Sequence, residues 1–397
     1  MEQWKKHRLG DVCVTNNAQY STKDNWDNAL YLDTGNITDN CIDDIILISD
    51  MVNGLPSRAR RKVKDKDILF STVRPNQRHI GILDNPYPNL LVSTGFAVIS
   101  VNIKKADPYF IYYFLSQQSV VDYLHAIAEQ AVSAYPSIKA SDIEDLEILL
   151  PNLAVQKRIS SILKSLDDKI ELNRRINDNL EQQAQALFDD MFFNNIELER
   201  YNLSNYADIN PFRSIKKNSE ARFIEMSNLP THGSFPLNWD YKHYNGGMKF
   251  SNGDTIMARI TPCLENGKTA YIDFLDDNEV AFGSTEYIVF SARNGYCPAL
   301  FYYLARNQEF IDYAISHMNG SSGRQRVSGN DIANFPMPHI SKDSSDKFGI
   351  IVMPIMSIIQ DNSIMNRALA QLRDTLLPRL MSGELRISEI ETEKNNG

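Results

Sequence analysis

Cysteine is scarce in this sequence, and long apolar runs are missing. The cysteines share no regular spacing, since they stand at Cys13, Cys41, Cys263 and Cys297. This pattern predicts neither a disulfide framework nor a zinc site, and it favours a reducing cytoplasm. The longest apolar run, residues 350–359, contains a proline and a serine and is too short to cross a bilayer. The charged amino terminus lacks an apolar core, so we expect no signal peptide and no membrane partner.

Motifs that carry catalysis are absent as well. The seven histidines form no HExxH cluster, and no glycine-rich loop ends in Lys-Ser or Lys-Thr to hold a phosphate. The stretch Asp84-Asn85-Pro86-Tyr87 is similar to the loop with which adenine methyltransferases hold their target amine, but it lacks one proline. No glycine-rich turn that could hold a methyl donor accompanies it, so we interpret the stretch as a turn. The sequence therefore predicts a chain with no catalytic site, no metal site and no cofactor of its own.

The balance of charge is acidic, with 41 Lys and Arg against 50 Asp and Glu and a net charge of −9. A negative net charge weakly disfavours a chain that binds nucleic acid by itself, although local clusters of basic residues matter more than the net charge. The hydrophobic share of 43% is ordinary for a globular protein. A length of 397 residues predicts two or three domains.

The stretch 154–193 predicts a long amphipathic helix. Steps of three or four residues connect its apolar positions, apart from one gap at Asn173, and neither glycine nor proline interrupts it. At roughly 1.5 Å per residue the helix would span about 55–60 Å. Such a helix cannot bury its apolar stripe against itself and needs a partner. The residues of the expected stripe are Ile159, Ile162, Leu166, Ile170, Ile176, Leu180, Leu187 and Met191.

A second stretch repeats this pattern 189 positions later, and Asn362 there corresponds to Asn173. A chance match between two amphipathic helices is the alternative, but the flanking regions repeat as well, so we infer an internal duplication. The two helices are expected to pair antiparallel as a coiled coil whose asparagines help to fix its register. Pro354 predicts that the second helix either kinks or begins nearby. The apolar positions of the second stripe are Phe348, Ile351, Ile355, Ile359, Met365, Leu369, Leu376 and Leu380.

The regions before the two helices also correspond. Each is typical of mixed α/β structure with short strands, and residues 284–287 correspond to 93–96, Asp254 to Asp67 and Pro262 to Pro75. The predicted fold class is therefore α/β, or α+β: two similar mixed α/β domains joined by two long helices that form an antiparallel coiled coil with a pseudo-twofold repeat. The expected boundaries are 1–152 and 196–342 for the domains, 153–195 and 343–385 for the helices, and 386–397 for a disordered tail.

Two similar domains on a rigid spacer suit a ligand with two sites at a fixed separation, and duplex DNA repeats its half-sites every ~34–36 Å. Arginine can pair with guanine edges, asparagine and glutamine with adenine edges, and a basic run with phosphates. For any single residue, a solvated surface loop is an equally good interpretation. The candidate DNA-contacting residues lie in two loop pairs and one basic run: Arg58, Arg60, Arg61, Thr72, Arg74, Asn76, Gln77, Arg78, Tyr135, Arg259, Thr261, Asn266, Lys268, Ser322, Arg324, Gln325 and Arg326.

Two short stretches carry a resemblance to a known family. Residues 151–159, PNLAVQKRI, and 376–385, LLPRLMSGEL, resemble the start of the central helix and the carboxyl terminus of the specificity subunits of type I restriction–modification systems. The order of elements resembles that family over nearly the whole chain. The resemblance implies two target-recognition domains, each reading one half of a split DNA sequence, and helices that set the gap between the halves.

The resemblance also implies partners. The family's helices dock two methyltransferase subunits, and restriction subunits complete a complex that methylates adenine and cuts DNA with ATP. S-adenosylmethionine, ATP and Mg would then belong to partner subunits. The chain departs from its own repeat where Glu286 replaces Gly95 and at the uncharged loop 133–137, and domains of the family diverge to read different sequences. The alternative that stays open is a coiled-coil scaffold, without catalysis, whose domains bind proteins.

Overall fold

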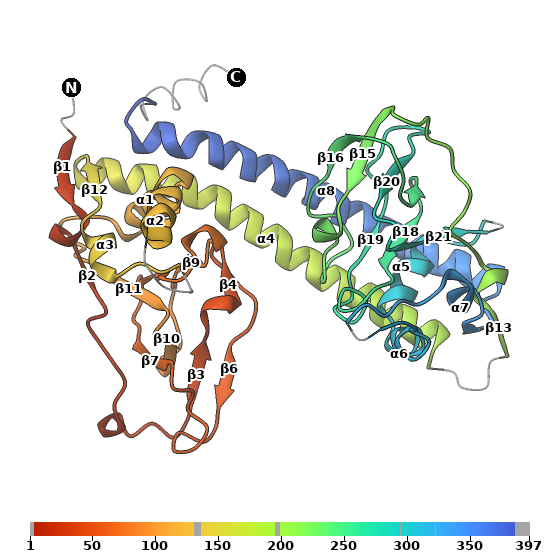
Figure 1. The fold of residues 1–397 in the computed structure, drawn as a ribbon, viewed down its shortest axis with the longest axis horizontal. Helices are drawn as coiled ribbons and strands as arrows, with labels where there is room; N and C mark the ends of the chain where they lie inside the picture. The colour runs from red at the N-terminus through yellow and green to blue at the C-terminus, as the bar shows by residue number, and fades with distance from the viewer. Residues whose placement is uncertain (1–3, 131–135, 195–198, 294, 322, 386–397) are drawn as a thin grey trace. The chain divides into compact units, whose positions relative to one another are not determined.

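The computed structural model describes residues 4–130, 136–194, 199–293, 295–321 and 323–385. Its contacts divide the chain into two compact units, which we call unit 1 and unit 2 (Figure 1). Unit 1 comprises residues 1–168 and 369–397, and unit 2 comprises residues 169–368. Two long helices each contribute one part to either unit. The domain boundaries drawn from the sequence stay a prediction.

Unit 1 is built on two four-stranded sheets. The first is antiparallel and has the order β2 (Cys13–Thr15), β11 (Phe96–Val101), β8 (Ile68–Ser71), β9 (Ile80–Ile82). The second has the order β6 (Ile46–Ile48), β3 (Ala29–Leu32), β10 (Leu90–Ser93), β7 (Ala59–Lys62), and its central pair, β3 with β10, is parallel. Two strand pairs complete the β structure: β1 (Lys5–Arg8) with β12 (Glu147–Leu150), and β4 (Ile37–Thr38) with β5 (Cys41–Ile42). The helices are α1 (Pro108–Ser116), α2 (Gln118–Gln130) and α3 (Ala140–Glu144), with short 3-10 turns at Leu9–Asp11, Thr22–Asp24, Thr34–Asn36 and Pro75–Gln77.

Unit 2 has the same arrangement. Its antiparallel sheet has the order β14 (Ala207–Ile209), β21 (Tyr287–Ala292), β18 (Thr255–Ala258), β19 (Thr269–Tyr271). Its second sheet has the order β16 (Asp240–His243), β15 (Glu220–Ile224), β20 (Ala281–Gly283), β17 (Lys249–Phe250), and again the central pair is parallel. The remaining elements are β13 (Arg200–Asn202) paired with β22 (Pro336–Pro338), helices α5 (Ala299–Arg306), α6 (Gln308–Ser316) and α7 (Gly329–Ala333), and 3-10 turns at Leu203–Asn205 and Met226–Asn228. Because sheet order and strand direction repeat, the predicted duplication is confirmed.

The central strand of each antiparallel sheet is buried on both faces, and its side chains alternate between two cores. In unit 1, Ile68 and Phe70 of β8 join the core that contains α1, whereas Leu69 between them joins a separate core with β3 and β10. In unit 2, Met257 joins the larger core and Ile256 the smaller one. This is the alternation that a β-strand imposes on consecutive side chains. Each unit therefore has a helix-side core and a second core between its sheets.

The two long helices are α4 (Leu153–Phe192) and α8 (Lys342–Met381), of 40 residues each. In unit 2, Asn173 Nδ2 donates to Asn366 Oδ1 at 2.8 Å, and Asn362 Nδ2 donates to Asn177 Oδ1 at 2.8 Å. Residue numbers rise along one helix as they fall along the other, so these segments are antiparallel, as predicted. The repeat of 189 residues relates Asn173 to Asn362 and Asn177 to Asn366. The two hydrogen-bonded asparagine pairs are therefore equivalent to each other under the repeat.

The predicted seam needs three corrections. Ile159, Ile170, Asn173 and Ile359 are buried, and Ile162, Leu166, Leu180, Leu187, Ile355, Asn362, Leu369 and Leu376 are partly buried. Ile176, Ile351 and Met365, in contrast, are 38%, 50% and 44% exposed. The residues that follow them, Asn177, Val352 and Asn366, face the interior in their place, because one residue turns a helix by about 100°. Pro354 also lies within α8, so the alternative in which the helix begins near it is wrong.

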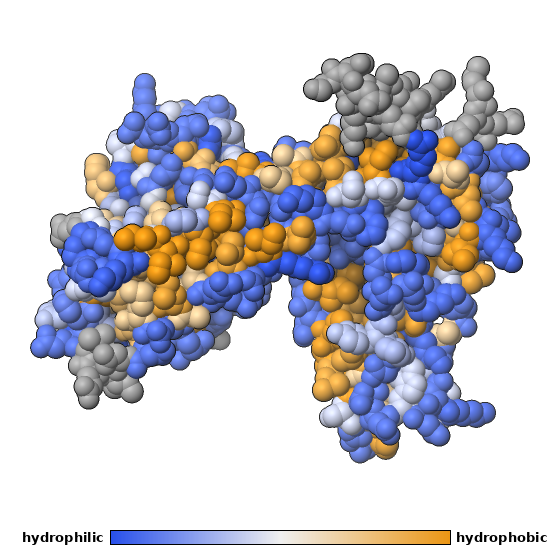
Figure 2. All heavy atoms as spheres, turned by 180° about the vertical axis from the view of Figure 1, so that it is seen from behind, coloured by the Kyte–Doolittle hydropathy of each residue, from blue (hydrophilic) through white to orange (hydrophobic). Residues whose placement is uncertain are grey.

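The apolar residues of α8 fall into two sets. Phe348, Val352 and Met356 are buried in the core of unit 2, whereas Ile350, Ile358 and Ile364 are 75%, 46% and 45% exposed. By length and composition alone α8 is apolar enough to cross a membrane, with a mean hydropathy of 1.4 over 18 residues, which the sequence analysis did not anticipate. Figure 2 shows the face of the molecule on which apolar side chains gather in a band. Packing within unit 2 therefore does not explain why Ile350, Ile358 and Ile364 are apolar.

Asp273, which follows β19 in unit 2, is a carboxyl group with a strongly shifted pKa. Its Oδ1 atom is buried and has no hydrogen-bond partner among the described residues, while Gln360 of α8 donates to its backbone oxygen at 2.5 Å. Burial raises the pKa of Asp273 to about 7, and the negative charge of Asp361 on α8 adds to the shift. The charged form is therefore disfavoured in the folded protein.

Replacing Asp273 with asparagine should stabilise the protein in a pH-dependent way. The unfolded chain releases this proton near pH 4, so between about pH 4 and 7 only the folded state holds it. The stabilisation from this proton is present below about pH 4 and is lost as the pH rises through 7. We expect Asp273→Asn to raise the free energy of unfolding by about 4 kcal/mol at pH 8, and by progressively less toward pH 4. Denaturant unfolding at pH 4.5 and 8 measures this, with the exposed Asp277→Asn as control, and an equal effect at both pH values would contradict it.

Candidate nucleic-acid interface

Two loops that contain candidate DNA-contacting residues meet at one end of the antiparallel sheet of unit 1. The loop after β8 runs beside residues 136–138, where Val73 forms a β-bridge with Ser137. The Arg74 amide donates to Pro136 O at 3.0 Å, and the Ile138 amide donates to Thr72 O at 2.9 Å. The candidate Tyr135 lies outside the described residues.

The corresponding loops of unit 2 meet in the same way. Ile260 forms a β-bridge with Arg326. The Thr261 amide donates to Gln325 O at 3.1 Å, and the Val327 amide donates to Arg259 O at 3.0 Å. The candidate Ser322 lies outside the described residues.

A β-turn from the second sheet completes both sites. In unit 1 the Thr72 amide donates to Gly95 O at 2.8 Å, and in unit 2 the Arg259 amide donates to Glu286 O at 2.9 Å. We call this set of main-chain bonds the loop frame. It consists of Thr72, Arg74, Gly95, Pro136, Ser137 and Ile138 in unit 1, and of Arg259, Thr261, Glu286, Gln325, Arg326 and Val327 in unit 2. The two units therefore share one backbone arrangement and carry different side chains on it.

In unit 1 the loop frame is mostly uncharged. Thr72 Oγ1 donates to Gly95 O at 2.8 Å, and a Cβ atom at Gly95 would lie 2.8 Å from Thr34 Cγ2, so a larger residue would displace Thr34. Arg74, Asn76 and Gln77 are exposed. These three polar side chains of the loop are accessible from outside the protein.

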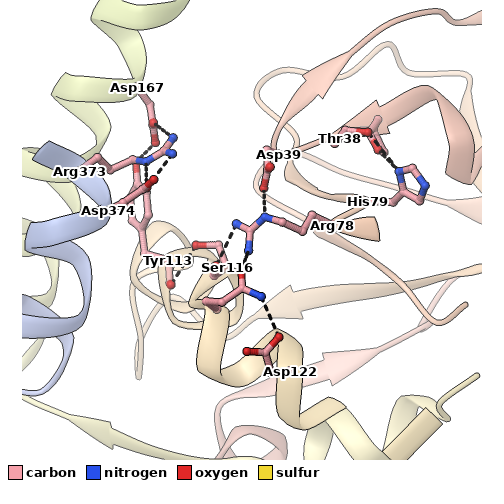
Figure 3. Close-up of polar contacts among 12 residues, drawn as sticks. Thr38, Asp39, Arg78, His79, Tyr113, Ser116, Asp122, Asp167, Arg373 and Asp374 are labelled. Carbon is pink, nitrogen blue, oxygen red and sulfur yellow. Dashed lines mark hydrogen bonds and ion pairs between the residues drawn. The ribbon is translucent and has the colours of Figure 1, made fainter. Parts of the chain in front are cut away.

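Arg78 has a structural role that the sequence did not predict. Its guanidinium donates to Asp39 Oδ1 at 2.7 Å, to Gln118 Oε1 at 3.1 Å and to Ser116 O at 3.1 Å (Figure 3). These bonds fix the loop to α1 and α2 and use three of the five N–H donors of the guanidinium. Its assignment as a DNA-contacting residue stays a prediction.

The predicted basic run lies on β7 and just before it, at the edge of the second sheet. The Thr94 amide donates to Arg58 O at 2.9 Å, which places the exposed Arg58 beside the β-turn that contains Gly95. Arg60 Nε donates to Ser57 O at 3.3 Å. Arg61 Nη2 donates to Thr94 O at 3.2 Å, and burial lowers the pKa of Arg61. Arg58 is thus the member of the run that is best placed to contact a ligand at the loop frame.

In unit 2 the loop frame carries a cluster of charges. Arg326 Nε lies 3.0 and 2.9 Å from the two carboxylate oxygens of Glu286, and Arg326 Nη2 lies 2.9 Å from Oε1. Arg259 Nε lies 3.8 Å from Glu286 Oε2. The Arg326 guanidinium lowers the pKa of Glu286, which is therefore charged at neutral pH.

The other candidates of unit 2 divide into structural and exposed residues. Lys268 Nζ donates to Met226 O at 2.9 Å and so braces its own loop. Asn266 and Arg324 are exposed, and Thr261 Oγ1 accepts from the Gln325 amide at 3.1 Å. Among the described residues no group of three His, Cys, Asp or Glu side chains could hold a metal ion.

Tyrosines connect each unit to its part of α4, which the sequence analysis missed. In unit 1, Tyr113 of α1 donates to Asp167 Oδ2 at 2.7 Å, and Arg373 of α8 donates to Asp167 Oδ1 at 2.8 Å (Figure 3). These groups and Arg78 line a cavity of about 420 Å³. In unit 2, Tyr302 of α5 donates to Glu181 of α4. The repeated Tyr-Tyr pair was visible in the sequence, but its partners lie 54 and 121 residues away along the chain.

Arg306 at the end of α5 forms hydrogen bonds to two loops of unit 2. Its guanidinium donates to the backbone oxygens of Thr231 at 2.5 Å, Gly267 at 2.7 Å and Gly233 at 2.9 Å, and more weakly to Thr269. It also lies over the Tyr302 ring, 5.5 Å from the centroid. One side chain thus joins two loops to α5, and through Tyr302 to α4.

Parts of the chain are similar in sequence to known proteins. Residues 1–182 match the type I restriction modification DNA specificity domain. The chain is 33% identical over 192 residues to the specificity subunit of the type I restriction enzyme HindI of Haemophilus influenzae, covering 48% of the chain and 41% of that subunit. It is 23% identical over 374 residues to the MjaIX specificity subunit of Methanocaldococcus jannaschii, covering 83% and 80%.

A solved structure has the same fold. The S subunit of a type I restriction-modification system from M. genitalium aligns over 96% of both chains, with a TM-score of 0.57 and 15% identity. The match to the HindI subunit covers less than half of that protein's length, whereas the fold extends over both units. Residues 1–182 are therefore similar to type I restriction modification DNA specificity domains.

Proposed function

We propose that this chain is the sequence-recognition subunit of a type I restriction–modification complex and has no catalytic role itself. Each unit reads one half of a split DNA sequence with the side chains on its loop frame. The observation that carries this proposal is the loop frame itself: one backbone arrangement, present twice, with a different set of polar side chains each time. Two domains that recognise two different half-sites of one DNA sequence need the same backbone arrangement with different side chains on it.

The side chains of the loop frames have the chemistry of base readout. Arginine donates to the O6 and N7 atoms of guanine, and asparagine and glutamine pair with adenine. Unit 1 presents Arg74, Asn76 and Gln77, and unit 2 presents Arg259, Arg324 and Gln325. Arg58 and Arg60 beside the frame of unit 1 are suited to phosphates.

The helices α4 and α8 set the gap between the half-sites and dock two methyltransferase subunits. The exposed apolar residues of α8, which include Ile350, Ile358 and Ile364, support a protein partner on this helix. Restriction subunits would join the methyltransferase subunits. S-adenosylmethionine, ATP and Mg are then bound by the partners, and this chain would work in the cytoplasm, where DNA is accessible.

Selection from a pool of random duplexes tests the proposal. The full chain, produced together with its methyltransferase subunit, is expected to enrich two short motifs separated by a fixed gap. Exchanging residues 1–152 for those of a relative should then alter one half-motif only. The scaffold alternative predicts no enrichment even when the methyltransferase is present, and that result would remove the proposal.

A further inference from the structure

The loop frames of the two units differ most at the position shared by Gly95 and Glu286. Both residues accept the same main-chain bond, from Thr72 in unit 1 and from Arg259 in unit 2. Unit 1 has no side chain at this position. Unit 2 has a carboxylate there, and two arginines of the same frame converge on it. The two units therefore differ in charge at this position, which is uncharged in unit 1 and negative in unit 2.

Arg259 is held in place by its backbone. Its amide donates to Glu286 O at 2.9 Å, and its carbonyl accepts from the Val327 amide at 3.0 Å. Its side chain is 28% exposed, and its Nε atom is buried with no hydrogen-bond partner among the described residues. At 3.8 Å the Glu286 carboxylate attracts this guanidinium without forming a hydrogen bond to it.

Arg326 is engaged by its neighbours. Three short contacts join its guanidinium to Glu286, and Nη1 donates to Arg324 O at 3.0 Å. Such a bidentate pair fixes both partners in one plane. Glu286 is consequently held in one orientation by Arg326, and its negative charge keeps the two guanidinium groups from repelling each other.

We propose that Arg259 reads a guanine in the half-site of unit 2, and that Glu286 and Arg326 are its positioning residues. Arg259 brings a guanidinium with unused donors on a fixed backbone, which suits the paired acceptors O6 and N7 on the major-groove edge of guanine. This inference rests on the proposed function, because it assigns the base that one of the two units reads. In unit 1 the equivalent residues, Thr72, Gly95 and Ser137, have no charge and must read their half-site by other contacts.

Substitutions in the full chain, produced with its methyltransferase subunit and selected against random duplexes, test the assignment. Arg259→Ala should lose the preference for G·C at one position of one half-motif, by roughly 5- to 150-fold. Arg259→Lys should lose most of the same preference, because lysine cannot form the bidentate pair. Glu286→Gln, which keeps the shape and removes the charge, should weaken the preference at the same position. The other half-motif should stay unchanged in all three variants.

Arg293→Ala is the matched control, since Arg293 forms an exposed ion pair with Asp208 in the same unit, away from the loop frame. It should leave both half-motifs intact. The unchanged half-motif of unit 1 also reports that unit 1 of each variant is folded and that the variant is bound to its partner.

Two results would overturn the inference. An equal loss of affinity for all sequences in Arg259→Ala would mean that Arg259 contacts a phosphate. An unaltered motif would mean that it does not read DNA. Both differ from failure of the proposed function, in which the unsubstituted chain itself enriches no split motif.

Discussion

Lengthening α4 and α8 together by one turn should widen the gap of the bound DNA sequence and leave both half-motifs as they were. Four residues add about 6 Å to a helix, which corresponds to at most about two base pairs at 3.4 Å each. The boundary between the units gives the insertion points: after Asp168 in α4 and after Ala368 in α8. No contact within either unit is broken there, and the asparagine pairs of unit 2 stay together.

Selection from random duplexes with a variable spacer measures this change. The control replaces Asp168 and Ala368 by glutamine and alters no helix length, so its gap should equal that of the unsubstituted chain. A variant that keeps the original gap but enriches a different half-motif would contradict the division of roles between helices and loop frames.

Replacing Arg306 with alanine should destabilise unit 2 by about 3 kcal/mol, because four backbone oxygens lose a charged donor. For a unit of this size the melting temperature should fall by roughly 6–12 °C. Arg306→Lys should recover little, since one ammonium group cannot reach oxygens on two separate loops. Calorimetry should show the transition of unit 2 shifted and that of unit 1 unchanged.

The matched control is Arg175→Ala on α4, whose exposed ion pair with Glu171 contributes about 0.3–0.5 kcal/mol. A loss of less than about 1 kcal/mol in Arg306→Ala would show that the loops of unit 2 hold their conformation without this side chain. In that case the preference for one base should also survive in the variant.

Local patterns in the sequence were sufficient to predict the architecture. The spacing of apolar residues predicted two long helices where α4 and α8 lie, and the 189-residue offset predicted two similar units. The sequence also identified loop 72–78, loop 133–137 and their counterparts in unit 2 as candidate DNA-contacting loops, but it did not predict that the two loops of one unit meet. These features repeat along the chain, so a comparison of the sequence with itself can detect them.

Contacts between distant residues could not be predicted in this way. Ile176 and Met365 fit the apolar spacing as well as their neighbours do, but the asparagine pairs that displace them form only when α4 meets α8. The hydrogen bonds of Arg78 to Asp39 and Gln118, which come from other parts of unit 1, could not be read from the sequence either. The substitution of Glu286 for Gly95 was visible, yet its meaning depended on Arg326, 40 residues further on.

The loop frame is held by main-chain hydrogen bonds, and this has a consequence for how such a protein can change over time. Most positions in it can accept new side chains without loss of the bonds that shape it, because amides and carbonyls are the same in nearly every residue. A few substitutions at exposed frame positions should therefore give the chain a new target sequence at little cost in folding, and one unit can diverge while the other continues to read its old half-site.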